Sequence, residues 1–174
     1  MSFIIWMTGL PCSGKTTIAR KLSEHISNLA VLDGDETRAL LSPNEDFSRK
    51  GIISHNDKVA NLAKLFLDHH VSVCVSKINP FVENRENARK ILKNYNFVEI
   101  YIKCSLDSCE KRDVKGMYKK ARNDEINNFI GIHVNYEPPT SPELIVDTEN
   151  STIDHNMQII LDYLNENSMI KNSR

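Results

Sequence analysis

Short apolar runs alternate along this chain with segments in which apolar residues recur every three or four positions. The short runs are typical of buried strands, and the spaced pattern is typical of amphipathic helices. The runs predict five strands, at residues 3–7, 30–32, 71–78, 98–102 and 144–146. The spaced segments predict helices at residues 14–26, 59–66, 83–94, 105–112 and 153–164. Strands that alternate with helices indicate an α/β fold around a mainly parallel sheet.

The remaining segments are polar and carry no clear period. Residues 42–53 are predicted to be irregular, and residues 113–142 read as a basic segment followed by a proline-rich loop. The tail from Asn165 is polar and is predicted to fray.

The length of 174 residues fits a single domain, residues 1–174. Lys plus Arg number 22 and Asp plus Glu number 23, so the net charge is -1 and argues against binding nucleic acid or an anionic membrane. No apolar run approaches the ~20 residues that cross a bilayer, and the amino terminus does not resemble a secretory signal. The four cysteines form no Cys-x-x-Cys pair, so we expect reduced thiols in a cytoplasmic protein and no zinc site.

Residues 9–16 carry the strongest chemical signal. Their sequence, GLPCSGKT, fits the phosphate-binding pattern G-x-x-x-x-G-K-[ST] between a predicted strand and a predicted helix. Glycines let the backbone approach phosphate oxygens, and the N–H groups at a helix start attract an anion. Lys15 is predicted to reach the terminal phosphates, and Thr16 to offer its hydroxyl to Mg²⁺. The sequence therefore predicts a nucleotide site but names no reaction.

A pair of carboxylates follows the second predicted strand, at Asp33 and Asp35. Carboxylates at a strand end beside a phosphate loop can hold Mg²⁺ or accept a proton from an attacking hydroxyl. The alternative is an ordinary turn with a helix-capping aspartate. A guanine-reading Asn-Lys-x-Asp motif is absent from the expected strand end, which argues against a GTPase.

Residues 111–122 concentrate positive charge, with six Lys or Arg against one Asp. Phosphoryl transfer needs added positive charge and exclusion of water, so we interpret residues 111–128 as a mobile basic lid. A solvated helix face is the alternative. Phe47 and Phe129 lie in polar segments, where either could stack on a base or pack into the core.

These segments together resemble the adenylylsulfate kinase family. The matching stretches are GLPCSGKTTIA, LDGDETR, the FS at 47–48, AKLF, INPF, CEKRDVKGMYKKAR, FIGI and YEPP, which span residues 9–143 in order. The resemblance implies a P-loop NTPase of the nucleoside-monophosphate-kinase type, a three-layer α/β/α fold with a five-stranded parallel core. It also implies ATP and Mg²⁺ as cofactors, and transfer of the γ-phosphate to a ribose 3′-hydroxyl.

The resemblance carries roles to matched positions. The catalytic candidates are Lys15, Asp33, Asp35 and Lys119, and the metal candidates are Thr16 and Asp33. The candidates for ATP binding are Gly9, Cys12, Ser13, Gly14, Lys15, Thr16, Thr17 and Arg112. The candidates for binding the acceptor are Asp35, Arg38, Phe47, Arg49, Asn79, Lys119, Arg122, Phe129 and Ile132.

The departures from the family pattern all lie on the acceptor side. Aligned without gaps from Ala63, an expected Arg is Ile52, and the usual Asn-Ile-Arg-Arg is His-Asn-Asp-Lys at 55–58. The usual Phe-Ile-Ser-Pro is Lys-Ile-Asn-Pro at 77–80. Replacing an anion-binding Arg by Ile costs a few kcal/mol.

These departures predict that the chain still uses ATP as the phosphate donor but phosphorylates a different acceptor. We expect cytidine diphosphoramidate, the acceptor of a related kinase of capsule biosynthesis. Adenylyl sulfate is the alternative acceptor. A nucleotide-binding regulator with weak ATPase activity and a plain nucleoside-monophosphate kinase remain as other classes. The expected partner is a small nucleotide, and the family resemblance implies a homodimer.

Overall fold

The computed structural model describes residues 2–170 and contains a five-stranded, all-parallel sheet in the order β2-β3-β1-β4-β5. The strands are β1 (Phe3–Thr8), β2 (Leu29–Asp33), β3 (Ser72–Ser76), β4 (Asn96–Lys103) and β5 (Leu144–Asp147). The helices are α1 (Lys15–His25), α2 (Gly34–Leu41), α3 (Arg49–Asp68), α4 (Val82–Ile91), α5 (Leu106–Arg112), α6 (Met117–Arg122) and α7 (Ile153–Glu166).

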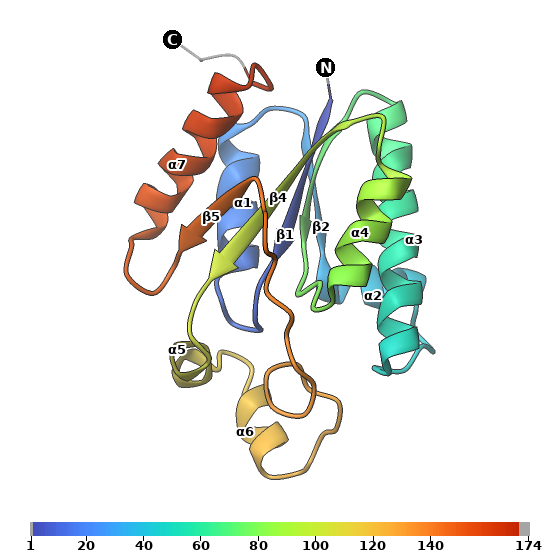
Figure 1. Cartoon of the computed structure of the whole chain (residues 1–174), viewed down its shortest axis with the longest axis vertical. Coiled ribbons are helices and arrows are strands. Elements are labelled where there is room, and N and C mark those ends of the chain that lie inside the picture. Colours follow the sequence, from blue (N-terminus) through green and yellow to red (C-terminus); the bar gives the residue numbers. More distant parts are fainter. Residues whose placement is uncertain (1, 171–174) are drawn as a thin grey trace.

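The side chains of β1 alternate between two apolar layers. Ile5 and Met7 pack in the cluster with residues of α1 and α7, while Ile4 and Trp6 pack with residues of α3 and α4. Figure 1 shows the two helix pairs on opposite faces of the sheet. Because both faces are covered, the strand is apolar throughout. The predicted three-layer α/β/α fold with a five-stranded parallel sheet is confirmed.

The prediction of irregular structure at residues 42–53 is wrong over residues 49–53, because α3 begins at Arg49. Ser48 caps this helix, and its hydroxyl accepts a hydrogen bond from the Gly51 N–H at 3.1 Å. Ile52 is buried, and from this residue onward apolar packing stabilises the helix. The polar tract is therefore irregular over residues 42–48 and then starts a helix.

The polar tail is ordered further than its composition predicted. Helix α7 extends to Glu166, and Met169 and Ile170 pack against the α1–α7 side of the core. The prediction of fraying is wrong for residues 165–170, since these apolar contacts hold them. The rest of that prediction falls on residues 171–174, which lie outside the described residues.

The parallel strands direct their carboxyl ends to one edge of the sheet. There the turn after β1 leads into α1, and Asp33 ends β2. Figure 1 shows α5 and α6 beyond the same edge. In open α/β sheets this edge is where ligands bind. The fold therefore brings the phosphate loop, the Asp33–Asp35 turn and the basic segment to one place.

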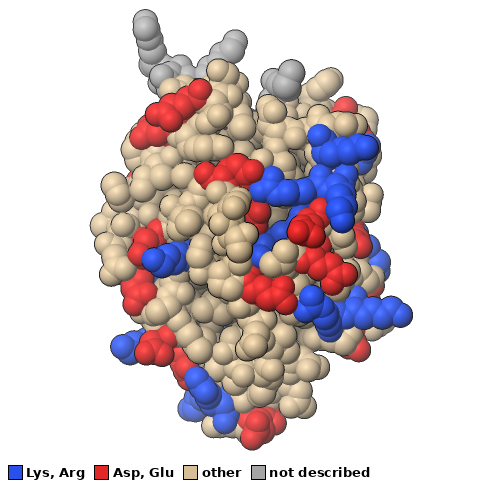
Figure 2. Space-filling view, viewed as in Figure 1, with Lys and Arg blue, Asp and Glu red and all other residues tan. Residues whose placement is uncertain are grey.

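The face of the molecule in view in Figure 2 carries charges of both signs. Figure 2 shows acidic and basic side chains interspersed on the face in view, without a broad area of one sign. Within residues 2–170, no helix combines the length and the apolar character that a membrane crossing requires.

Candidate active site

The loop between β1 and α1 wraps closely because two of its residues are glycine. Gly9 has a φ of +155°, and a Cβ there would lie 2.5 Å from the carbonyl oxygen of Ile102. Gly14, at the start of α1, has a φ of +97°. Any other residue at these positions would be strained or would collide with β4. The loop is thus shaped to present its backbone N–H groups to an anion.

Lys15 lies inside this loop. Its ammonium group donates to the carbonyl oxygens of Gly9 at 2.9 Å and Leu10 at 2.6 Å, and to the Ser13 hydroxyl at 3.2 Å. The residue is only 7% exposed. Burial lowers the pKa of Lys15 to about 8, because the charged form loses hydration. The loop therefore holds a desolvated cation where the terminal phosphates of a nucleotide would bind.

This shift predicts an alkaline limit on activity. The Lys15 ammonium is charged below its pKa of about 8 and neutral above it, so kcat/KM for ATP is expected to fall as the pH rises through about 8. At saturating ATP the fall in kcat is expected at higher pH, because a bound phosphate favours the ammonium. Initial rates measured from about pH 6.5 to about pH 9.5, roughly one and a half pH units on either side of the Lys15 pKa, test this prediction. A kcat/KM that rises across the range contradicts it.

Thr16 and Asp33 form an oxygen pair beside the loop. The Thr16 hydroxyl donates to Oδ2 of Asp33 at 2.8 Å, and Oδ1 of Asp33 accepts from the Asp35 N–H at 2.9 Å. A hydroxyl and a carboxylate suit Mg²⁺, which binds through few protein ligands and keeps waters and substrate phosphates. Among residues 2–170, no group of three or more His, Cys, Asp or Glu is placed to form a metal cage. This donor set fits a metal that arrives with a nucleotide.

Asp35 faces the basic segment. Its carboxylate forms an ion pair with Lys115, across 80 residues of sequence, and its side chain is 75% exposed. The lid candidate is also attached to the phosphate loop, because the buried Tyr118 donates its hydroxyl to the Pro11 carbonyl at 3.0 Å. Asp113 accepts from the N–H groups at the start of α6. Residues 113–118 therefore lie against both the loop and Asp35 in this structure.

The other cations of this segment differ in their surroundings. Arg112 donates to the Thr148 carbonyl at 2.6 Å and approaches the Cys12 carbonyl at 3.4 Å, beside the phosphate loop. Arg122 forms two hydrogen bonds of 2.9 Å with Glu110, on the exposed surface. Lys119 is exposed. The ATP-binding role of Arg112 and the acceptor roles of Lys119 and Arg122 stay predictions.

The two candidate stacking residues lie in different surroundings. Phe47 is 56% exposed, and the Arg38 guanidinium lies 4.5 Å from its ring centroid. Phe129 packs edge-on against Tyr118, with ring centroids 4.9 Å apart, in the small apolar cluster that also contains Ile132. An exposed ring and a half-buried ring near the lid are both suited to contact a base. Their acceptor roles stay predictions.

Two predicted acceptor residues are engaged by the protein itself. Arg49 lies 4.0 Å above the Phe81 ring and forms ion pairs with Glu83 and Glu137. Asn79 is 1% exposed, and its amide nitrogen donates to the Met7 carbonyl at 2.7 Å. Asn79 is thus turned into the protein, whereas Arg49 is half-exposed and already paired with two carboxylates. Their acceptor roles stay predictions.

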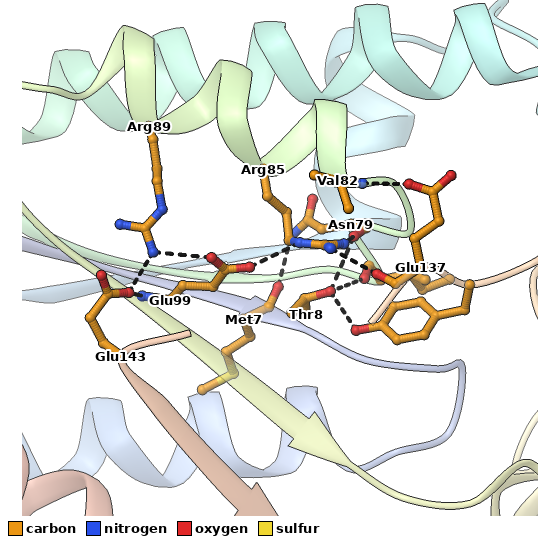
Figure 3. Close-up of polar contacts among 11 residues, drawn as sticks. Met7, Thr8, Asn79, Val82, Arg85, Arg89, Glu99, Glu137 and Glu143 are labelled. Atoms are coloured by element: carbon orange, nitrogen blue, oxygen red, sulfur yellow. Dashed lines mark hydrogen bonds and ion pairs between the residues drawn. The ribbon is translucent and has the colours of Figure 1, made fainter. Parts of the chain in front are cut away.

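A buried polar network holds the loop after β3. Figure 3 shows Arg85 of α4 between Glu99 of β4 and the carbonyl oxygens of Asn79 and Glu137. Arg85 and Glu99 lie 2.9 Å apart with side chains 4% and 7% exposed. Arg89 donates to the same carboxylate at 3.0 Å. The network thus joins the segment around Asn79 to the proline-rich loop that contains Glu137.

Removing the charge of Glu99 is expected to destabilise the fold. In Glu99→Gln the buried Arg85 guanidinium loses its counter-ion, which costs about 3 kcal/mol in comparable cases. Urea unfolding followed by circular dichroism measures the change. Asp68→Asn is the matched control, since it removes an exposed carboxylate paired with Lys64 and is expected to cost under about 1 kcal/mol. Equal costs for the two variants would contradict this reading of the network.

Two residues near the loop were not anticipated from the sequence. Thr148 donates its hydroxyl to the Ser13 carbonyl at 2.7 Å. A Cβ on Gly14 would lie 3.6 Å from Cγ2 of Thr148. Its position directly after β5, at the same edge of the sheet, was the available signal. Lys77 was recognised only as a departure from the family pattern, although its position directly after β3 places it at that edge too.

The comparisons with known proteins agree on one family. The family model described as adenylylsulphate kinase matches residues 1–147. An adenylyl-sulfate kinase of Oceanobacillus iheyensis is 41% identical over 173 residues, 97% of this chain and 87% of that protein. One from Staphylococcus epidermidis is 40% identical, with the same coverage of 97% and 87%. A solved structure of the Mycobacterium tuberculosis APS kinase with AMPPNP and APS has a TM-score of 0.87 and 36% identity, covering 94% of this chain and 97% of that chain.

These relatives contradict the acceptor that the departures predicted. Proteins about 40% identical over nearly the whole chain are named adenylyl-sulfate kinase, so the expectation of cytidine diphosphoramidate and of a role in capsule biosynthesis is wrong. That expectation gave great weight to the missing Arg at position 52. Ile52 is buried with Phe81 and Ile130, so this position serves apolar packing.

Proposed function

The chain belongs to the adenylylsulphate kinase family, and from this premise we propose that it transfers the γ-phosphate of ATP to the ribose 3′-hydroxyl of adenylyl sulfate. The chain is a phosphotransferase with an alcohol group as acceptor, and it uses ATP with Mg²⁺. The identity of the alcohol is the part that we propose. The relatives named above support it.

The observation that carries the proposal is the meeting of three sequence-distant parts at one edge of the sheet. Thr16 of the phosphate loop contacts Asp33, and Asp35 two residues later contacts Lys115 of the basic segment. The phosphate loop, the candidate base Asp35 and the lid cation Lys115 are therefore adjacent. Phosphoryl transfer depends chiefly on such positioning and on charge that offsets the transition state.

The proposed mechanism assigns one task to each of these parts. Lys15 and the loop N–H groups bind the terminal phosphates of ATP, and Thr16 with Asp33 would hold Mg²⁺, which would neutralise charge on the phosphates. Asp35 accepts the proton of the ribose 3′-hydroxyl as the hydroxyl oxygen attacks the γ-phosphorus in line. The bond from the γ-phosphorus to the bridging oxygen of the β-phosphate breaks, and ADP leaves. Lys115 and Lys119 add positive charge from the lid and help to exclude water.

The proposal is tested by a product analysis. Purified protein is incubated with Mg·ATP and adenylyl sulfate, ADP release is followed, and ³¹P NMR locates the new phosphate. We expect acceptor-dependent ADP release and a phosphomonoester on the 3′-oxygen. A regulator with weak ATPase activity would release ADP at the same rate without acceptor. A nucleoside-monophosphate kinase would place the phosphate on a 5′-phosphate, and either result would reject the proposal.

We also propose a homodimer that works in the cytoplasm. All four cysteines are unpaired, which accords with a reducing compartment. The dimer follows from the family alone, and sedimentation velocity would detect it.

A further inference from the structure

Lys77 is a buried cation that the proposed mechanism leaves unused. It directly follows β3, and only 8% of its surface is exposed. Its ammonium group donates to the Asn56 side-chain carbonyl on α3. No carboxylate among residues 2–170 lies within ion-pair distance of it, and the Glu45 charge acts on it only from farther away. Burial, with the Arg38 charge, holds its pKa well below the usual value. An ammonium buried without a counter-ion is costly, so its retention needs an explanation.

The groups around Lys77 also have unused hydrogen-bonding capacity. The Asn56 amide nitrogen and His55 Nε2 are buried, and neither has a hydrogen-bond partner among the described residues. His55 Nδ1 lies 3.0 Å from the Ser42 hydroxyl. Burial and the nearby Lys77 charge lower the pKa of His55 to about 3, so its ring is neutral at physiological pH. When the Ser42 hydroxyl donates to Nδ1, Nε2 carries the proton and is a free donor.

This donor cluster, Lys77 with Asn56 and His55, lies next to the candidate base. A Cβ on Gly34, between Asp33 and Asp35, would lie 3.3 Å from Lys77 Cγ. The neighbouring Ser76 hydroxyl lies 3.3 Å from the Thr16 hydroxyl. The cluster is therefore on the acceptor side of the phosphate loop, within the same edge of the sheet.

Three departures from the family pattern given above meet in this cluster, at positions 55, 56 and 77, which here are His, Asn and Lys. The Asn56 and Lys77 side chains contact each other. A further departure, at Ile52, removes a positive charge from α3 and adds apolar packing against Phe81. In that alignment, positive charge is lost at positions 52 and 57 and gained at position 77. Buried donors without partners, beside a cation, form a site for an oxyanion.

We propose that Lys77, supported by Asn56 and His55, binds the terminal oxyanion of the acceptor, which is the sulfo group of adenylyl sulfate. The inference rests on the proposed function for the identity of that group. It makes Lys77 a residue that determines acceptor affinity in this chain. The cation does so from the position directly after β3, where the family pattern places an aromatic residue.

Lys77→Met removes the charge and keeps the length of the side chain. The KM for adenylyl sulfate is expected to rise about 10- to 100-fold, the size of a lost charge-assisted hydrogen bond, while the KM for ATP stays within about twofold. Lys64→Met on α3 is the control, since the Lys64 side chain is half-exposed and forms an ion pair with Asp68. An acceptor KM unchanged by Lys77→Met would overturn the proposal.

A double variant separates binding from packing. Asn56→Ile with Lys77→Phe restores the apolar pair of the family pattern and is expected to fold at least as stably as the parent, because a buried charge is removed. Its acceptor KM is nevertheless expected to stay raised. If the double variant regains the KM of the parent, Lys77 has only a packing role and the proposal fails.

An anion-binding measurement separates this inference from the proposed function. Calorimetric titration of inorganic sulfate is made in the presence of Mg·ADP, which fills the phosphate loop. We expect sulfate affinity to fall at least tenfold in Lys77→Met. A parent protein that does not phosphorylate adenylyl sulfate but shows this fall rejects the proposed function and keeps the oxyanion site. Turnover of adenylyl sulfate with sulfate binding and acceptor KM independent of Lys77 rejects the site alone.

Discussion

Lys15→Met is expected to lower kcat/KM for ATP by about 1000-fold or more, because the transition-state charge loses a desolvated cation. Lys15 is 7% exposed and makes three hydrogen bonds to loop oxygens, so no water-exposed lysine can take its place. Initial rates over a range of ATP concentrations measure the loss.

Stability measurements show that such a loss is not unfolding. Burial disfavours the charged form of Lys15, so methionine is expected to leave the unfolding midpoint unchanged or higher. Lys21→Met is the matched control, since it removes an exposed cation of the same helix, paired with Asp154. Turnover of Lys15→Met close to the parent value would reject the assignment of the phosphate loop.

Asp35→Asn is expected to lower kcat by about 100- to 10 000-fold while the affinity for ATP changes little. The amide keeps the size of the side chain but cannot take the proton of a sugar hydroxyl, and it loses the ion pair with Lys115. The backbone N–H at position 35 still donates to the Asp33 carboxylate, which caps α2, so the local turn is kept. Single-turnover rates and equilibrium binding of an ATP analogue separate chemistry from binding.

Glu36→Gln is the control for Asp35, because Glu36 is the next residue in α2 and is exposed. It is expected to retain nearly full activity. If Asp35→Asn instead abolishes ATP binding and leaves the chemical step unchanged in the bound complex, the acceptor-side role of Asp35 is wrong.

Local pattern was sufficient for most of the fold. The apolar runs lie within the observed strands or within two residues of their ends, and the loop at residues 9–16 joins β1 to α1 as its motif required. Prediction failed where polar residues start a helix, as at Ser48 before α3. A capping serine and an ordinary loop serine look alike until the buried side of the helix is known.

The candidate site was predictable in part. Motif spacing predicted Lys15 and Thr16, and the end of the second strand predicted Asp33 and Asp35; the structure places Thr16 against Asp33. The acceptor side was misjudged because spacing does not show which of the departing residues contact one another. The Lys77–Asn56 contact joins positions 21 apart in the sequence, so the loss of charge at position 52 and the gain at position 77 could not be related.

The amino-acid sequence by itself determined the parallel α/β architecture and the phosphate loop, since both depend on short-range spacing and on the apolar period of single elements. The chemical class came from the resemblance of longer stretches to one family. The tertiary structure alone decided which charges are buried and which are paired. Arg49 joins Glu83 and Glu137, Asp35 joins Lys115, and Lys77 is left with a neutral partner. Electrostatic roles depend on distance and hydration, and both are properties of the folded chain.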